Sequence, residues 1–371
     1  MFLRTILNTA HRMVYPFLST YARGLGVDIS TMSYLMSARS LLGATSPFFA
    51  PIADRRGRRF GMLSGFAVFT FGVGVVAIYP NLYTLAAAII LAVVGKYMFD
   101  PSMQAYFGDR IPYAQRGTAL AVTEVAWSAA FFAGVPFMAF LIGKYGWSAP
   151  FPALAVFGAL AFIVVWNIIP REDPHHERTT DSRAGYRAVF SSIPAMAGIS
   201  IALWASAANE LVTIIFGVWL EDSFGLKLAA LAGASAVIGV AELSGEGLVA
   251  FTTDKLGKPL ALSIGLIGNA LAALALPVIG KTQTGALIGL FLFYITFEYV
   301  MVSHIPLMTE IVPSARATIL SMNVTGHSIG RALGAFLATI IYQRFGFLFV
   351  ALLAVMFNIA GMLALRRMQR Q

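Results

Sequence analysis

The chain has 371 residues, of which 58% are hydrophobic and 12% charged, and its mean hydropathy is +0.77. A soluble domain cannot bury that much apolar surface, because its outside needs more polar cover. Cysteine is absent, which excludes disulfides, thiolate chemistry and cysteine metal sites. In a soluble protein the net charge of +9 would suggest nucleic-acid binding, but here the distribution of basic residues among loops explains it better and no nucleic-acid partner is expected.

Apolar runs of about 20 residues recur along the whole chain. They predict an all-α membrane protein with twelve transmembrane helices, and not a β-barrel, whose strands alternate over about ten residues. The first run begins beside Met1 and is expected to serve as its own insertion signal. The expected spans are 3–22, 30–50, 61–79, 82–102, 117–142, 149–168, 193–217, 228–251, 260–278, 284–308, 317–342 and 347–365.

Lysine and arginine are concentrated in one of the two sets of loops between these spans. By the positive-inside rule, that set lies in the cytoplasm. We therefore expect a plasma-membrane protein with both termini and the Asp54 loop on the cytoplasmic side. The rich set contains Arg4, Arg55, Arg56, Arg58, Arg59, Arg110, Arg116, Arg171, Arg178, Arg183, Arg187, Lys255, Lys258, Arg316, Arg366, Arg367 and Arg370, and the poor set contains Arg23, Lys144, Lys227, Lys281 and Arg344.

The longest polar stretch, Pro170 to Arg187, has the composition of a mobile linker and divides the spans six and six. The predicted organisation is a bundle over residues 1–169, a cytoplasmic linker over 170–190 and a second bundle over 191–371. His175, His176 and Glu177 in this linker are read as solvated side chains, so no metal site and no cofactor are expected.

The two halves repeat each other at an offset of 200 or 201 residues. Asp54 corresponds to Asp254 and Gly57 to Gly257. The segment 109–116 corresponds to 310–316, and Gly146-Trp147 corresponds to Gly346-Phe347. A parallel duplication of six spans predicts two pseudo-symmetric bundles with a solute site between them near the middle of the membrane.

The segment from Asp54 to Arg59 has an acid, a base, a glycine and further bases between spans two and three, and it resembles the loop signature of the major facilitator superfamily. Ala50 stands where that family usually has glycine, and Pro259 replaces the last base of the second copy. Span five carries Gly134-Val135-Pro136 and lacks the glycine-rich antiporter signature. The resemblance covers the whole chain and implies a secondary transporter that works by alternating access.

The resemblance also implies that spans three, six, nine and twelve face lipid, whereas the other eight surround the solute path. It further implies that the two loop motifs latch the halves together on the cytoplasmic side, although simple anchoring by positive charge is an alternative. The expected gate residues are Asp54, Arg55, Gly57, Arg58, Arg59, Asp254, Lys255, Gly257 and Lys258.

Ionisable residues inside a membrane mark functional sites, because a charge there is costly unless it is paired or wet. They are absent from spans three, six, nine and twelve, in agreement with the resemblance. The candidates for proton coupling or substrate binding are Glu242, Glu246, Glu298, Asp100, Arg39, Arg331, Arg12, Lys96, Glu124 and His327.

For several of these candidates the sequence indicates a specific functional role, and each also has a purely structural explanation. Glu242 and Glu246 share one helix face, as expected of a proton carrier or of a pair neutralised by cations. Lys96 and Asp100, at i and i+4, fit a local ion pair. His327 and Arg331 share a face beside Gly330 and Gly334, which suggests close helix packing.

For the remaining candidates the sequence indicates only an approximate position and role. Arg39 lies mid-span and suits carboxylate or phosphate recognition. Glu298 is the acid most expected in the cavity, whereas Glu210 is expected to be a solvated acid near the outer face. Glu124 fits ion pairing at the cytoplasmic end as well as coupling. Of the aromatic residues, those that could line the path of an amphipathic solute are Trp127, Trp204, Tyr294 and Tyr299.

These patterns predict a monomeric secondary transporter for a small solute, coupled to protons, and the first expectation is efflux of an amphipathic compound. The alternatives are uptake of an organic anion through the arginines, lipid translocation, and a membrane sensor or scaffold without transport. The HExxH motif, the nucleophile elbow and the phosphate loop are all missing from the sequence, so an enzyme is not expected.

Overall fold

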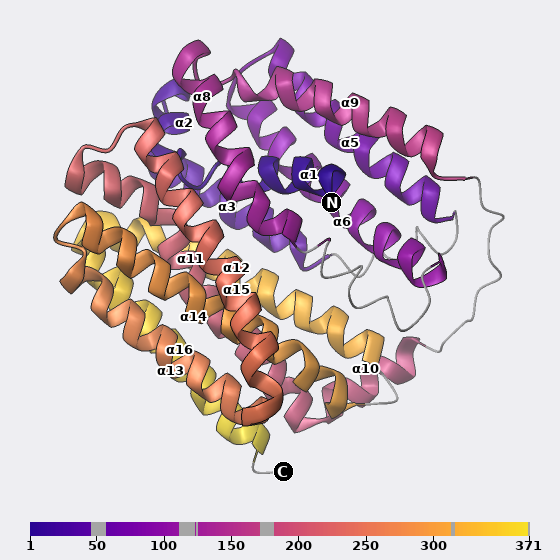
Figure 1. Ribbon diagram of the computed structural model, residues 1–371, viewed down its shortest axis with the longest axis vertical. Helices are drawn as coiled ribbons and strands as arrows, with labels where there is room; N and C mark the ends of the chain where they lie inside the picture. Colours follow the sequence, from indigo (N-terminus) through magenta and orange to yellow (C-terminus); the bar gives the residue numbers. More distant parts are fainter. Residues whose placement is uncertain (46–56, 111–122, 124, 171–181, 313–315, 370–371) are drawn as a thin grey trace. The chain divides into compact units, whose positions relative to one another are not determined.

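The computed structural model describes residues 1–45, 57–110, 123, 125–170, 182–312 and 316–369, which are helical almost throughout and contain no strand (Figure 1). Within lipid no water is present to bond the backbone N–H and C=O groups, and an α-helix satisfies them within its own segment. The elements are α1 (Phe2–Arg12), α2 (Leu18–Leu25), α3 (Ile29–Gly43), α5 (Arg58–Ile78), α6 (Leu82–Arg110), η2 (Ala130–Gly134), α8 (Val135–Tyr145), α9 (Pro150–Ile168), α10 (Ser182–Ser191), α11 (Ile193–Phe224), α12 (Leu228–Leu256), α13 (Lys258–Ile279), α14 (Gln283–Ile311), α15 (Arg316–Phe345) and α16 (Phe347–Gln369).

Ten helices within these residues are long and apolar enough to cross a membrane. They match the predicted spans three to twelve, and α1 to α3 occupy the first two. The all-α membrane fold is therefore confirmed. The predicted first span is divided into α1 and α2, with non-helical residues at 13–17. Pro16 explains the break, because proline cannot donate to the backbone ladder and clashes with the preceding turn.

The chain forms two compact units, and neither is one uninterrupted stretch of sequence. Unit 1 contains Met1–Asp28, Thr45–Arg178 and Leu228–Gly239, and unit 2 contains Ile29–Ala44, Thr179–Lys227 and Val240–Gln371. Helix α3 therefore packs with the later helices, and α12 contributes to both units.

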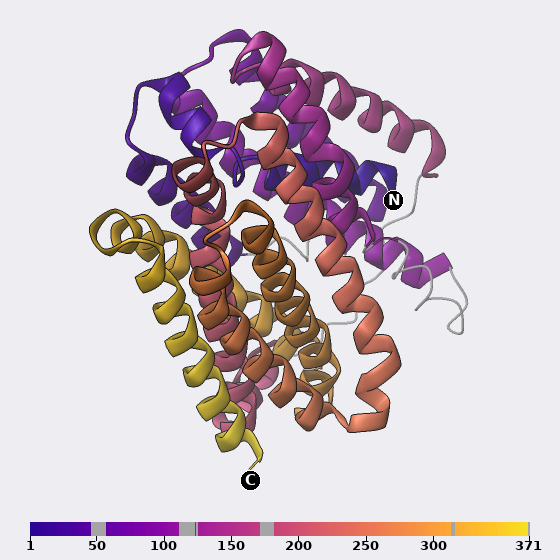
Figure 2. The same ribbon diagram turned by 60° about the vertical axis from the view of Figure 1, so that its left-hand side comes forward.

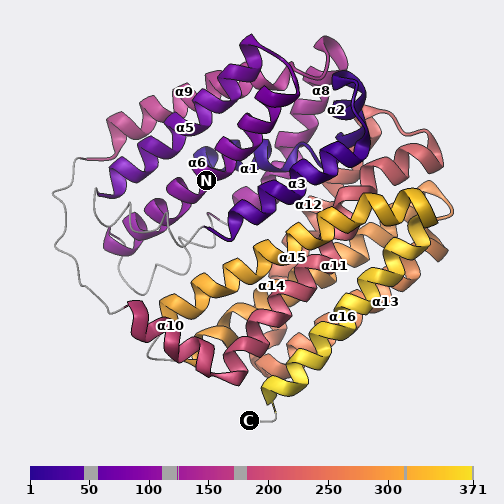
Figure 3. The same ribbon diagram turned by 180° about the vertical axis from the view of Figure 1, so that it is seen from behind.

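In unit 1, α5 packs between α6 and α9 (Figures 1 and 3). Gly65 and Gly95 allow the closest approach: a Cβ on Gly65 would lie 2.6 Å from the Gly95 carbonyl oxygen, and one on Gly95 would lie 2.5 Å from that of Gly65. Phe66 packs edge-on against Phe99 beside this crossing, with ring centroids 5.0 Å apart. Small residues at a crossing let backbones approach and gain dispersion contacts within lipid.

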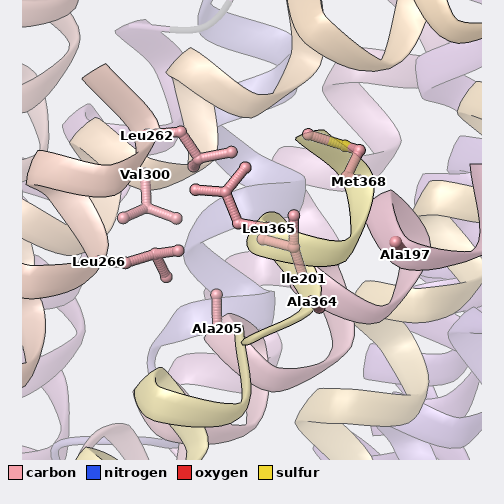
Figure 4. Close-up of a cluster of buried hydrophobic side chains, with 9 residues drawn as sticks. All are labelled: Ala197, Ile201, Ala205, Leu262, Leu266, Val300, Ala364, Leu365 and Met368. Carbon is pink, nitrogen blue, oxygen red and sulfur yellow. The ribbon is translucent and has the colours of Figure 1, made fainter. Parts of the chain in front are cut away.

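In unit 2, α11 is the central helix, with 89% of its most apolar segment buried, and it packs against both α15 and α16. Helix α13 packs against both α14 and α16, in the orange and yellow part of Figure 2. Side chains from α11, α13, α14 and α16 meet in one apolar cluster (Figure 4). The cluster contains Ala197, Ile201, Ala205, Leu262, Leu266, Val300, Ala364, Leu365 and Met368.

Spans three, six, nine and twelve correspond to α5, α9, α13 and α16. Each carries large apolar side chains on its exposed face, among them Phe71 on α5, Leu160 on α9, Leu271 on α13 and Met356 on α16. Exposed apolar side chains on helices of this length are the expected surface toward lipid.

The glycines paired by the sequence repeat adopt matching backbone conformations. Gly57 and Gly257 have φ of 88° and 81° and directly precede α5 and α13, and Gly146 and Gly346 have φ of 92° and 79°. Only glycine adopts such φ values without strain. The repeat is thus visible in the turns as well as in the sequence. The stretch expected to be a linker differs in part, since its last residues belong to helix α10.

Replacing Gly330 by alanine is expected to destabilise unit 2. A Cβ there would lie 2.0 Å from the Leu203 carbonyl oxygen and 2.8 Å from its carbon, so backbone would have to move. Overpacking of this kind costs about 1–3 kcal/mol. Thermal unfolding of the purified protein measures the loss. Gly233→Ala is the matched control, because a Cβ at Gly233 would meet nothing within 4 Å, and equal melting of the two variants would contradict the prediction.

Candidate functional site

A cluster of buried charges forms in unit 1 between α1 and α6. Lys96 Nζ lies 2.6 Å from Asp100 Oδ2, and Arg4 Nε lies 3.2 Å from Asp100 Oδ1. Lys96 also donates to Asn8 Oδ1 at 2.6 Å, and Arg4 donates to the Thr123 carbonyl oxygen at 3.0 Å. The predicted pair of Lys96 and Asp100 is thus present, and a second cation shares the same carboxylate.

Helix periodicity explains why these groups meet. Arg4, Asn8 and Arg12 follow one another at intervals of four on α1 and so share one face, as do Lys96 and Asp100 on α6. A Cβ on Gly134 would lie 2.0 Å from Thr9 Oγ1, so η2 approaches α1 closely. Single π-turns inside helices are frequent at functional sites.

Arg12 lies in an aromatic corner of the same cluster. Its guanidinium carbon is 3.6 Å from the centre of the Phe131 ring and 4.4 Å from that of Trp127, and it donates to the Trp127 carbonyl oxygen at 3.0 Å. Lys96 Nζ lies 5.6 Å from the Trp127 ring centre, and the His11 ring lies 5.9 Å away. Rings held over a guanidinium fix its plane.

The charges of this cluster are deeply buried, with exposed fractions of 6% for Arg4, 3% for Arg12 and 9% for Lys96. The interpretation of Arg4 as a cytoplasmic loop residue was wrong, because α1 begins at Phe2 and turns Arg4 toward Asp100. Glu124, the other candidate acid nearby in sequence, lies outside the described residues.

A second polar network lies in unit 2 between α11, α14 and α15. His327 Nδ1 is 2.8 Å from Ser206 Oγ, and its Nε2 is 3.2 Å from Asn323 Nδ2. The His304 ring on α14 lies 6.4 Å from that of His327. His304 is 1% exposed and His327 is half-buried, so α14 and α15 place two imidazoles near each other.

The glycines beside His327 and Arg331 pack closely, as predicted. A Cβ on Gly334 would lie 2.6 Å from the Ala207 carbonyl oxygen and 2.8 Å from Glu210 Cβ. Glu210 is 1% exposed. Its expected role as a solvated acid near the outer face was therefore wrong, because α15 covers it.

Three candidate acids lie on α12 and α14 of unit 2. Glu242 is 3% exposed, and Glu246 follows one turn later, half-buried. A Cβ on Gly245, between them, would lie 2.8 Å from Glu298 Cβ. The glycine therefore allows α12 and α14 to approach each other closely at Glu298.

Arg39 is buried in α3, with 2% of its surface exposed. Two serines of the same helix hold it to α15 by donating to backbone carbonyl oxygens, Ser37 to Ala332 at 2.7 Å and Ser33 to Ala335. These bonds explain why α3 belongs to unit 2.

The predicted gate residues are only partly described. Lys258, at the start of α13, forms an ion pair with Glu310, and Arg59 donates to the Trp166 carbonyl oxygen at 2.6 Å. Arg58 begins α5, and the last turns of α12 contain Asp254 and Lys255. Asp54 and Arg55 lie outside the described residues.

Aromatic side chains divide between the site and the core. Trp127 contacts the charged cluster, whereas Tyr294 and Tyr299 are buried and hydrogen-bonded to Thr213 and Thr252. Trp204 packs against Phe357, with ring centroids 5.4 Å apart. Of the four predicted aromatics, Trp127 lies against two candidate charges, those of Arg12 and Lys96. Sequence reasoning missed Arg4, Asn8 and Ser206, which show no signal until the helices are packed.

Among the described residues no group of three His, Asp or Glu side chains could hold a metal ion.

Comparisons with known proteins agree with this architecture. The chain is 22% identical over 331 residues to the MFS-type transporter YbcL of Bacillus subtilis, covering 89% of this chain and 84% of that protein. It is 23% identical over 299 residues to the sialic acid transporter NanX of Escherichia coli, covering 77% and 71% of the two chains.

Solved structures share the fold. A bacterial homologue of the human lysosomal transporter Spinster, inward-facing and unoccupied, superposes with a TM-score of 0.81 at 14% identity, covering 100% of this chain and 96% of that one. The peptide transporter POT in complex with sulfate gives 0.82 at 15% identity, covering 100% and 93%. Residues 1–309 match the family profile described as Major Facilitator Superfamily. The chain therefore belongs to the Major Facilitator Superfamily and is an integral membrane protein of the secondary-transporter type.

Proposed function

We propose that this transporter carries a small organic anion with an aromatic or apolar body, together with protons. The observation that supports the anion is that unit 1 buries three cations, Arg4, Arg12 and Lys96, in one cluster of α1 and α6. Arg12 would bind the carboxylate or phosphate edge-on, because two aromatic rings hold its plane. Trp127 would contact the body of the solute.

This substrate class differs in emphasis from efflux of an amphipathic compound, the first expectation from the sequence. The aromatic residues that favoured such a compound are mostly engaged in packing, as Tyr294 and Tyr299 are. Uptake of an organic anion was the alternative, and the buried arginines favour it.

Proton coupling follows from the charge of the solute. Moving one negative charge into a cell against an inside-negative potential costs about 2.3 kcal/mol per 100 mV. A proton carried with each negative charge removes that cost. We assign this role to Glu242, Glu246 and Glu298, because Glu242 is 3% exposed and the helices that carry the three acids approach closely at Gly245.

The test is reconstitution in proteoliposomes with a pH-sensitive dye inside. A series of aromatic carboxylates and their neutral amides is added outside at an imposed pH gradient, with potassium and valinomycin setting the potential. The carboxylates are expected to drive proton movement and the amides are not. Preloading the same solutes inside determines the direction.

Glu242→Gln, Glu246→Gln and Glu298→Gln are then compared with Glu221→Gln, which removes an acid near the end of α11. At least one of the three is expected to abolish proton movement, and the control is expected to retain it. Unchanged proton movement in all three would remove these acids from the mechanism. Absence of solute flux in the parent protein would favour the sensor or scaffold alternative.

A further inference from the structure

A cavity of about 530 Å³ lies in unit 2, where α11 and α15 end and α3 and α16 begin. This volume is within the range of small-molecule sites. None of the candidate residues named from the sequence lines it, and its walls belong wholly to unit 2. The cavity is therefore separate from the charged cluster of unit 1 and from the acids of α12 and α14.

Asp222, near the end of α11, is the one charged side chain among the residues that line the cavity. Tyr342 of α15 donates its hydroxyl to Asp222 Oδ2 at 2.8 Å, which fixes the position of the carboxylate. Two helix C-termini and two helix N-termini meet around the cavity, so their dipoles offset one another. The carboxylate then determines the sign of the charge that the cavity prefers, and this is a cation.

An aromatic wall stands beside this carboxylate. The Trp219 ring is stacked on the Phe347 ring at 3.9 Å with an angle of 4° between them, and Phe224 meets Trp219 edge-on at 6.3 Å. A Cβ on Gly280 would lie 2.7 Å from the Trp219 ring, so the ring has backbone close behind it. A rigid aromatic wall needs little ordering when a ligand binds, and it attracts ammonium groups and apolar bodies alike.

Thr339 of α15 adds a hydrogen-bonding group to the same cavity. Its side chain is fully buried, at 0% exposure, and it lines the cavity. Within the described part of the chain its hydroxyl has no hydrogen-bond partner. Buried hydroxyls are nearly always paired, so this group is suited to a ligand that supplies the missing partner.

We propose that this cavity binds an organic ammonium, with its charged nitrogen at Asp222 and its apolar or aromatic body along Trp219 and Phe347. A polar atom of the ligand pairs with the Thr339 hydroxyl. The site goes beyond the proposed transport of an anion and takes a ligand of opposite charge. The predicted topology places these helix ends on the side away from the cytoplasm, where an external amine reaches them.

The test uses three ligands of one shape, namely 4-phenylbutylammonium, 4-phenylbutanol and 4-phenylbutyrate. Binding to the purified full chain in nanodiscs is measured by calorimetry, with empty nanodiscs subtracted to remove partition into lipid. The ammonium is expected to bind most tightly and the carboxylate least. Asp222→Asn is expected to weaken binding of the ammonium about tenfold, which is the usual effect of losing one charge-assisted hydrogen bond.

Glu221→Gln is the matched control, because it removes the same charge one position away and Glu221 does not line the cavity. Trp219→Phe is expected to weaken binding of all three ligands by a similar factor, because it reduces the area of the apolar wall and keeps the Asp222 carboxylate. Asp222 is exposed, so its replacement leaves the fold intact, and thermal unfolding verifies this. Equal binding of the ammonium to the parent and to Asp222→Asn, or equal binding of the ammonium and the carboxylate to the parent, would overturn the proposal.

Discussion

Asp100→Asn is expected to lower the free energy of unfolding by about 3 to 5 kcal/mol, the usual cost of removing one partner from a buried ion pair. Asp100 is the shared partner of Arg4 and Lys96, and both cations are buried. An asparagine keeps the shape and can still accept a hydrogen bond, but two positive charges then lose the carboxylate between them. Thermal and denaturant unfolding in detergent measure the loss.

The matched control for this prediction removes a cation together with the acid. In the double variant Asp100→Asn, Lys96→Met the apolar stem stays and the charge of Lys96 goes, so part of the lost stability is expected to return. A double variant less stable than Asp100→Asn alone would contradict the argument. So would a single variant that unfolds at the temperature of the parent, because Asp100 would then contribute nothing to holding α1 on α6.

The class of fold could be predicted from the sequence because lipid imposes a strong and local constraint. Runs of about 20 apolar residues are read without knowledge of any partner. The turn glycines were equally local signals, and Gly57 and Gly257 do adopt the positive φ that only glycine allows. The break between α1 and α2 was also visible in principle, since Pro16 marks it.

The site was predicted less well, because its contacts join residues far apart in the chain. Arg4 looked like one more cytoplasmic charge, and its partner Asp100 is 96 positions away. The bond between Ser206 and His327 spans 121 positions. A lone serine or asparagine within an apolar span gives no sign of its partner. Charged residues within apolar spans indicated a site, because a charge in lipid is costly. Uncharged hydrogen-bonding residues gave no such indication until the helices were packed.

Arg12→Lys is expected to reduce transport of an anionic solute at least about tenfold while the protein stays folded. Lysine keeps the positive charge and can still donate to the Trp127 carbonyl oxygen, the contact that Arg12 makes at 3.0 Å. It loses the planar fork that binds a carboxylate through two parallel bonds and the flat face that packs on Phe131. Initial rates in proteoliposomes over a range of solute concentrations measure the effect, which is expected mainly in KM.

Arg23→Lys is the matched control, because Arg23 is an exposed residue in the last turn of α2 and the same chemical change there should leave transport unaltered. Neutral amides of the solutes separate recognition from a general defect. If Arg12 binds the anion, the variant loses its preference for the carboxylate over the amide. If Arg12 only packs α1 against Trp127 and Phe131, both solutes decline together, and a parental KM for the carboxylate in Arg12→Lys would exclude the residue from solute binding.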